Sequence, residues 1–359
     1  MDEMGKKFDK TAKNNAVTYI MVIVAWLVMM ALQQAGMLNS STTGLLVPVC
    51  IYSIMAVSLN LTVGILGDLS LGQAGFMCVG AFASALFTNL AQDSIAFTPL
   101  RFTLAILIGA LVAGVFGLLI GIPVLRLSGD YLAIVTLAFG EIIKNFLNIL
   151  YVGKDSHGLH VSLKDTMSLG MEPDGVVIIK GAQGITGTSR DATFTIGIIL
   201  LLISLFIVLR LIQSRDGRAI RSIRDNRIAA ESIGINITKY KLLALTVSAA
   251  IAGMAGALYA HNYNSLAATS AKFGYNMSIM ILVYVVLGGI GNIRGSVIAA
   301  TLLYVLPEKL RFLQSYRMLI YAVVLIVVML FSWSPKARDF RERYSLKRLI
   351  HKNTAKEAE

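Results

Sequence analysis

The chain has 359 residues, of which 56% are apolar and only 14% are charged. About a quarter of the residues in ordinary soluble domains are charged, and one soluble core could not enclose this much apolar surface. The composition excludes disordered, collagen-like and disulfide-stapled secreted proteins, and it predicts an all-α polytopic membrane protein.

The predicted membrane spans are apolar runs, and about 20 residues suffice to cross a bilayer. In chain order the ten runs are Ala16–Leu32, Leu45–Val63, Leu71–Leu90, Phe102–Leu125, Tyr131–Tyr151, Thr193–Ile212, Leu242–Ala260, Asn276–Leu287, Ser296–Leu306 and Met318–Trp333. No small-x-small cleavage motif follows the first run, so we expect it to remain as a span. Glycines interrupt Asn276–Leu306, which predicts either a re-entrant pair or a tight turn between short helices. Eight to ten spans fit the sequence.

The net charge of +12 would favour nucleic acid as the partner of a soluble protein. Threading ten spans from a cytoplasmic N-terminus places 22 of the 32 Lys and Arg residues in the cytoplasm and nine outside. This bias follows the positive-inside rule. We therefore expect a multi-pass membrane protein with both termini in the cytoplasm and no nucleic-acid partner.

The predicted domains follow from this threading. They are a cytoplasmic tail (1–15), a membrane domain (16–334) with an outer loop (152–192) and an inner loop (213–241), and a basic cytoplasmic tail (335–359). The outer loop has no sustained periodicity and is too short for a domain.

Small residues recur at every fourth position in two predicted spans. The first series is Gly109, Ala113, Gly117 and Gly121, and the second comprises Ala249, Gly253 and Ala257 beside Ala252, Gly256 and Ala260. Small side chains on one helix face let backbones approach closely in lipid. This pattern predicts a tightly packed bundle.

Sequence motifs for catalysis are missing. The chain has no G-x-x-x-x-G-K-[ST] loop, no H-E-x-x-H, no G-x-S-x-G and no paired cysteine motif. Cys50 and Cys78 are expected to be small buried apolar residues. We therefore expect no enzyme activity, no metal site and no bound cofactor, and any ATP must be hydrolysed by another chain.

Three segments together carry a resemblance to a known family. They are Gly64–Phe76 (GILGDLSLGQAGF), Leu127–Ile143 (LSGDYLAIVTLAFGEII) and the stretch from Arg215 (RDGRAIRSIRDN) to Ala257. The chain resembles the larger membrane permease subunit of bacterial branched-chain amino-acid ABC importers. Urea and short-chain amide permeases look similar.

This resemblance implies a type II ABC importer permease fold with about ten helices. It also implies a translocation path shared with a sister permease, usually as a heterodimer. Two cytoplasmic ATPases, which bind ATP and Mg, and an extracytoplasmic binding protein would complete the importer.

The inner loop is strongly basic, and its arginines recur at every third residue. A solvated loop that only sets topology would have the same charge. However, the segment Ala229–Gly234 resembles the E-A-A-x-x-x-G coupling motif of ABC permeases, with Ile228 in place of the glutamate. The resemblance implies contact with an ATPase through the residues Arg218, Arg221, Arg224, Asp225, Ala229, Ala230 and Gly234. We expect Ala230 and Gly234 to lie where the two proteins press together.

Polar residues inside apolar segments are the candidates for the substrate pathway. They are Asn60, Ser70, Gln73, Thr136 and Glu141, with Gln183 in a glycine-rich segment of the outer loop. Lone Ser and Thr side chains often bond to their own helix backbone instead. Glu141 and Lys144 lie three residues apart and can pair on one helix face, either as a functional group or as a structural ion pair.

Two other classes of function remain as alternatives. A secondary transporter or channel would need no ATPase and predicts discontinuous helices around a central ion site. An intramembrane enzyme would need a nucleophile with its base or a metal, and the sequence offers neither constellation.

Overall fold

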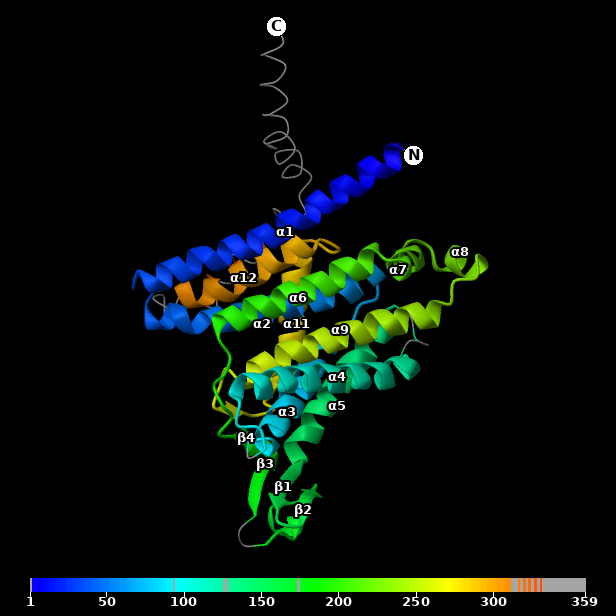
Figure 1. Cartoon of the computed structure of the whole chain (residues 1–359). Coiled ribbons are helices and arrows are strands. Elements are labelled where there is room, and N and C mark those ends of the chain that lie inside the picture. Colours follow the sequence, from blue (N-terminus) through cyan, green and yellow to red (C-terminus); the bar gives the residue numbers. More distant parts are fainter. Residues whose placement is uncertain are drawn as a thin grey trace. The chain divides into compact units, whose positions relative to one another are not determined.

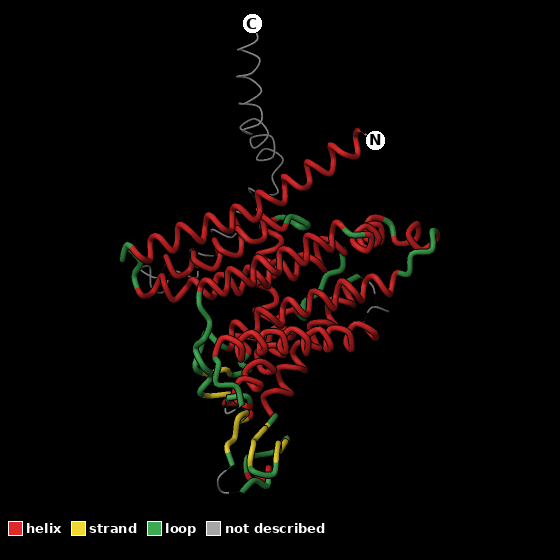
Figure 2. The backbone as a smooth tube through the Cα atoms, viewed as in Figure 1, coloured by secondary structure: helices red, strands yellow, loops and turns green. Residues whose placement is uncertain are grey.

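The structure is a computed structural model that describes residues 2–92, 94–124, 127, 129–172, 175–310, 316, 319–320, 322–323, 326–327 and 330, with side chains from residue 15 onward. The chain divides into two compact units, Met1–Thr301 and Leu302–Glu359. Nearly all described residues belong to the first unit, which is mainly helical and carries one small sheet (Figure 1, Figure 2).

The helices of the first unit are long apolar helices and the shorter connecting helices α7, α8 and α10. They are α1 (Asp2–Gln34), α2 (Ser40–Asn60), α3 (Gln73–Leu90), α4 (Thr98–Val124), α5 (Asp130–Ile149), α6 (Phe194–Gln213), α7 (Arg215–Asp225), α8 (Arg227–Ser232), α9 (Ile237–Ala260), α10 (Ser270–Phe273), α11 (Tyr275–Gly288) and α12 (Ile293–Lys309), of which α12 ends beyond Thr301. A π-helical turn, η1 (Leu61–Leu66), continues α2, and η2 (Met167–Leu169) and η3 (Gly181–Gln183) are short 3-10 turns.

Eight helical segments in the described part of the chain are long and apolar enough to cross a membrane. Each predicted span up to Leu287 overlaps one of them, and the all-α polytopic fold class is confirmed. The predicted span Ser296–Leu306 lies within α12, which has 17 residues and is not among the eight. Most of Met318–Trp333 and all of the tail 335–359 lie outside the described residues.

The glycine interruption after α11 is a tight turn between two helices. Gly289 and Gly291 adopt φ values of +94° and +81°, which glycine tolerates because it has no Cβ. Asn292 N donates a hydrogen bond to Gly289 O at 2.9 Å and closes the turn. Of the two arrangements that the sequence allowed, the structure has the tight turn.

The core lies where α3, α4 and α9 pack through their small residues. A Cβ on Gly80 would lie 2.4 Å from Gly253 Cα, and one on Gly117 would lie 2.5 Å from Ala249 Cβ. Gly109 faces the carbonyl of Gly80 in the same way. The prediction that these stripes pack helices together is confirmed. Helix α2 lies beside this group, between α6, α9 and α11, and is almost entirely buried.

The 152–192 connection forms most of a five-stranded antiparallel sheet. Its strands are β1 (Tyr151–Asp155), β2 (Gly158–Ser162), β3 (Val176–Lys180), β4 (Ile185–Thr186) and β5 (Ser265–Leu266), in the order β2-β1-β3-β4-β5. The sequence did not predict this sheet. Strands β4 and β5 have only two residues each. In β1 (YVGKD) and β3 (VVIIK), apolar and polar residues do not alternate, and alternation is the pattern that identifies a half-buried strand.

Helices α6 and α9 join the two ends of the bundle. Helix α9 follows the α7–α8 segment and ends shortly before β5. Its 24 residues make it about 36 Å long. Helix α6 runs between β4 and α7. The α7–α8 segment and the sheet therefore lie at opposite ends of these helices (Figure 1).

Candidate coupling site and substrate pathway

Three polar caps shape the segment between α6 and α9. The Ser214 side chain accepts a hydrogen bond from Gly217 N, that of Asn226 from Ala229 N, and that of Asn236 from Lys239 N. Each cap satisfies a backbone donor at the start of a helix. The caps divide this stretch into α7, α8 and the start of α9, so the predicted inner loop is two short helices.

A small apolar cluster holds these helices together. Ile223 of α7, Ala230 of α8 and Ile237 of α9 form it, and each is at most 8% exposed. Ala230 is 2% exposed, so it lies inside the loop's own core and not on the surface where we expected it. Gly234, by contrast, has a φ of +83° and open space around its Cβ position.

The exposed apolar side chains of the loop are two isoleucines that the sequence analysis did not select. Ile228 is 81% exposed and Ile233 is 74% exposed. Ala229 is exposed beside them. In the motif comparison Ile228 was only a departure from the coupling motif. The signal that could have identified it is a large apolar side chain directly after Arg227 in a strongly basic loop.

The arginines of α7 bind backbone carbonyls. Arg218 Nη1 donates to Gln213 O at 3.3 Å, and Arg221 Nη2 donates to Ile212 O at 2.5 Å. Both contacts fix α7 to the end of α6. Arg224 reaches another segment, since its Nη1 donates to Gly64 O at 3.1 Å while its Nη2 pairs with Asp225 at 2.9 Å.

Glycines of the first motif make this approach possible. A Cβ on Gly67, which has a φ of +85°, would lie 2.6 Å from Arg224 Cγ. Next to it, Lys241 of α9 forms an ion pair with Asp68 at 2.5 Å, and the two side chains are only 6% and 18% exposed. Two independent contacts therefore connect the α7–α9 segment to the end of η1. The sequence analysis did not predict this ion pair.

Asn60 links two segments that are distant in the sequence. Its side chain is fully buried, its Nδ2 donates to Ser296 Oγ at 2.7 Å, and its Oδ1 accepts from Gly291 N at 2.9 Å. This candidate pathway residue therefore holds η1 against the α11–α12 turn.

Three further candidate pathway residues lie inside the unit. Ser70, Gln73 and Thr136 are at most 2% exposed. Gln73 Nε2 donates to the hydroxyls of Ser58 and Ser248, and Thr136 Oγ1 donates to Ala133 O while it accepts from Leu71 N. The Ser70 hydroxyl has no hydrogen-bond partner among the described residues. Gln73 thus connects α3 to α2 and α9, and Thr136 connects α5 to the segment before α3. The role of all three residues in transport remains a prediction.

Glu141 and Lys144 form the predicted pair, with 2.5 Å between Lys144 Nζ and Glu141 Oε2. The pair also joins α5 to the next helices. Lys144 Nζ donates to Ser270 Oγ at 2.9 Å, and Glu141 Oε1 accepts from Tyr275 N at 2.8 Å. Lys144 is buried, whereas the Glu141 side chain is 25% exposed. The carboxylate thus combines a structural contact with access from outside the subunit.

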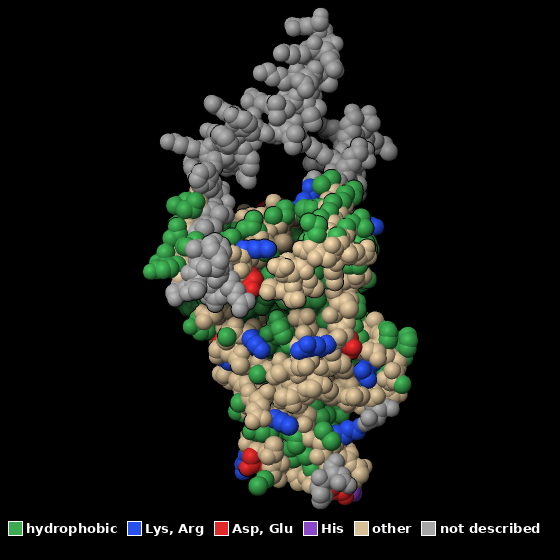
Figure 3. Space-filling view, turned by 90° about the vertical axis from the view of Figure 1, so that its left-hand side faces the viewer, with side chains coloured by type: hydrophobic (Ala, Val, Ile, Leu, Met, Phe, Trp, Pro, Cys, Tyr) green, Lys and Arg blue, Asp and Glu red, His purple; other side chains and the backbone are tan. Residues whose placement is uncertain are grey.

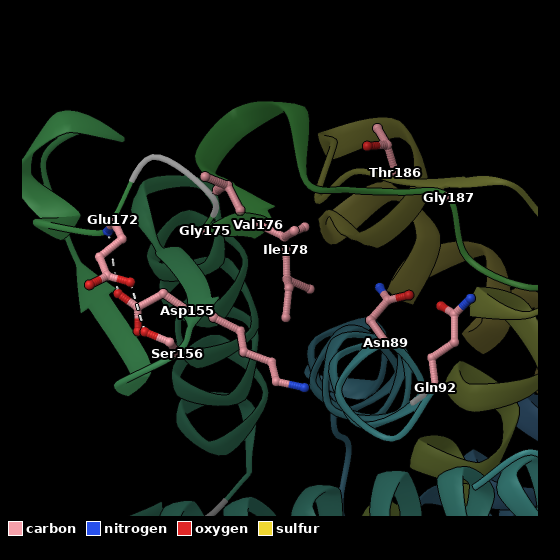
Figure 4. A pocket seen from close by; sticks show the side chains of 12 residues that line it. Asn89, Gln92, Asp155, Ser156, Glu172, Gly175, Val176, Ile178, Thr186 and Gly187 are labelled. Carbon is pink, nitrogen blue, oxygen red and sulfur yellow. Dashed lines mark hydrogen bonds between the residues drawn. The ribbon is translucent and has the colours of Figure 1, made fainter. Parts of the chain in front are cut away.

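A polar cavity of about 570 Å³ lies between the sheet and the end of α3. Asn89 and Gln92 point toward it from the α3 side, and Asp155, Ser156 and Glu172 line the opposite wall (Figure 4). Gln183 is exposed in η3 and is not among the lining residues.

The carboxyl of Asp155 is held in its charged form at this cavity. Burial raises its pKa, but hydrogen bonds from the backbone of His157 and Glu172 and from His160 outweigh this effect, so the pKa is lowered from its usual value. His160 Nε2 lies 2.9 Å from Asp155 Oδ2. Within the described residues, no group of three or more His, Cys, Asp or Glu side chains is placed to hold a metal ion.

Comparison with known proteins identifies the family. Residues 41–329 match the family described as the permease component of branched-chain amino acid transport systems.

The high-affinity branched-chain amino acid transport system permease protein LivM of Salmonella typhimurium is 32% identical over 341 residues, which cover 92% of this chain and 78% of that protein. A probable LivM of Methanocaldococcus jannaschii is 25% identical, with 74% and 80% covered. LivH of Salmonella typhimurium is 23% identical, with 70% and 79% covered. No solved structure matches the chain. The chain is a multi-pass membrane protein that belongs to the permease component family of branched-chain amino acid transport systems.

Proposed function

We propose that this chain forms half of the translocation pathway of an ABC importer for leucine, isoleucine and valine. The family match over residues 41–329 and the relatives named for branched-chain amino acids support this substrate class. The structural observation that carries the coupling role is the α7–α8 segment. It exposes Ile228 and Ile233 and is linked to the end of η1 through Arg224 and Lys241.

The coupling role requires partners. In this proposal a cytoplasmic ATPase receives Ile228 and Ile233, and a second ATPase serves a sister permease. Exposed apolar side chains on helices that are fixed by a packed cluster, here Ile223, Ala230 and Ile237, are suited to fill a pocket of a partner protein. Hydrolysis of ATP takes place on the ATPase subunits, and this chain has no enzyme activity of its own.

The orientation follows from the charges. Five arginines between Arg215 and Arg227 lie at the α7–α8 end, so the positive-inside rule places this end in the cytoplasm of an inner-membrane protein. The sheet and the polar cavity then lie outside, where an extracytoplasmic binding protein delivers the substrate. Glu172, whose side chain is 50% exposed, and the amides of Asn89 and Gln92 would offer that protein polar contacts.

Reconstitution tests this function. The chain is expressed with the neighbouring permease, ATPase and binding-protein genes, and uptake of labelled leucine, isoleucine and valine into proteoliposomes is measured with and without ATP. We expect ATP-dependent uptake of all three. Uptake of urea or a short-chain amide instead would reassign the substrate, and uptake that needs no ATPase would assign the chain to the secondary transporters.

A further inference from the structure

Polar side chains lie exposed at the middle of α5 and at the adjoining start of α11. Glu141 is about 16 Å from the first residue of α5 and about 12 Å from the last at 1.5 Å per residue. Asn145 is one turn further along the same face and is exposed. On the neighbouring segment, Asn276 is exposed beside Tyr275, whose backbone binds Glu141. Neither asparagine side chain pairs with another of the described residues.

The other long helices expose a different kind of surface. Between residues 104 and 124, every exposed side chain of α4 is apolar: Leu107, Leu111, Val115, Phe116, Leu118, Leu119, Ile122 and Pro123. The exposed side chains of α6 before Arg210 are apolar too. The exposed apolar faces of α4 and α6 suit lipid, in which an unpaired polar side chain is costly. Figure 3 shows another view of the surface, on which hydrophobic side chains and charged side chains both appear.

The α5–α11 face, defined by Glu141, Ile142, Asn145, Tyr275, Asn276 and Ile279, therefore does not suit lipid. It combines apolar surface, with Ile142 59% and Ile279 40% exposed, with amides and one accessible carboxylate. A branched-chain amino acid has the matching chemistry, because it carries an apolar side chain, an ammonium group and a carboxylate.

We infer that the α5–α11 face is this subunit's wall of the translocation pathway and that Glu141, with Asn145 and Asn276, is a polar contact for a zwitterionic amino acid. The inference rests on the proposed function. Glu141 faces the substrate's ammonium group, and the two asparagine amides can bind either end of it. Lys144, buried behind Glu141, keeps the carboxylate in place. The Ser70, Gln73 and Thr136 side chains do not reach this face, because the unit buries them.

Thiol labelling of the complete transporter tests the position of this face. Asn145→Cys and Asn276→Cys are compared with Leu111→Cys, which is at the middle of α4 and 66% exposed. The wild-type complex is the blank, because Cys50 and Cys78 are buried. We expect a charged, membrane-impermeant methanethiosulfonate to modify both asparagine replacements at least tenfold faster than Leu111→Cys, and to block uptake in both.

Two labelling results would overturn the inference. If Asn145→Cys reacts only with a membrane-permeant maleimide, as Leu111→Cys should, the face meets lipid. If neither reagent reaches Asn145→Cys or Asn276→Cys, another subunit covers the face. If the cysteine variants label as expected but the wild-type complex takes up no branched-chain amino acid, the proposed substrate is contradicted while the pathway wall stands.

Removing the charge of Glu141 tests the contact with the substrate's ammonium group. Glu141→Gln keeps an oxygen that can accept the Tyr275 N–H but removes the negative charge. We expect leucine uptake per inserted transporter to fall at least tenfold with unchanged ATPase copurification, even if the unpaired Lys144 lowers the protein level. Adding Lys144→Met removes the unpaired charge that the first change leaves and should not restore uptake. Recovery of wild-type uptake in the double variant would assign the pair to holding α11 in place and would overturn the contact.

Discussion

Arg224 of α7 donates a hydrogen bond to the carbonyl oxygen of Gly64, which lies 160 residues earlier in the chain. The acceptor belongs to η1. Arg224 can approach it because Gly67, which follows η1, has no Cβ. This contact connects the segment proposed to bind an ATPase to η1. The residue directly before η1, Asn60, holds the α11–α12 turn in its place, since it accepts a hydrogen bond from Gly291 N.

Arg224→Ala should weaken the link between ATP hydrolysis and transport. A hydrogen bond from a charged donor contributes about 1.5–3 kcal/mol, and less here because the side chain is 39% exposed. We expect uptake to fall severalfold while the ATPase still copurifies and still hydrolyses ATP. Arg215→Ala is the control, since Arg215 is exposed, and it should change neither quantity. Equal uptake by the two variants would remove Arg224 from the coupling route.

Ile228→Asp and Ile233→Asp should each prevent ATPase recruitment without affecting the fold. Both side chains are exposed, so the free permease tolerates the charge, whereas burying a carboxylate against a partner costs several kcal/mol. Copurification of the ATPase measures the loss, and the melting temperature should not change.

Ala230→Glu is the contrasting variant. Because Ala230 is packed among Ile223 and Ile237, the glutamate should disrupt the loop itself and lower both the melting temperature and recruitment. Normal stability with lost recruitment in this variant would return Ala230 to the contact surface.

Lys241→Met should destabilise the protein by about 3–5 kcal/mol, because it leaves the Asp68 carboxylate buried without its partner. The double change Lys241→Met with Asp68→Asn removes the charge from both sides and should recover most of the loss. Thermal unfolding in detergent measures each variant. If the double variant is no more stable than the single one, the two residues do not act as a pair.

Gly80→Ala should separate α3 from α9, because its Cβ would lie 2.4 Å from Gly253 Cα and backbone cannot rotate away. Overpacking of this kind costs about 1–3 kcal/mol. Gly44→Ala in α2 is the matched control. It meets nothing within 4 Å, so it should be neutral or stabilise the helix by up to about 1 kcal/mol.

The purified chain without its partners should neither bind nor hydrolyse ATP, because the sequence has no phosphate-binding loop. Nucleotide binding by calorimetry and phosphate release check this expectation. Hydrolysis in a preparation free of other subunits would contradict the proposed division of labour.

The sequence predicted those parts of the fold that repeat a simple pattern. Apolar runs identified the long helices, and four-residue spacing of small residues predicted tight helix packing, which the structure shows between α4 and α9. The sheet was not predicted because β4 and β5 have two residues each and because apolar and polar residues do not alternate in β1 and β3. The burial of Ala230 and the exposure of Ile228 escaped for another reason. They depend on how α7, α8 and α9 pack around each other, and neighbouring residues in a motif carry no sign of which one points inward.

The backbone contacts along α9 have a mechanical consequence. Gly253 lies against main-chain atoms of α4 and the Ala113 Cβ, and Gly256 lies against main-chain atoms of α3. No flexible side chain separates the helices at these points, so α9 cannot bend or slide there by changing rotamers. The helix begins at the α7–α8 segment and ends next to β5. A displacement of α9 at the α7–α8 segment is therefore expected to move its end beside β5 as well. Under the proposed function, α9 would transmit movement between the ATPase contact and the face that receives the substrate.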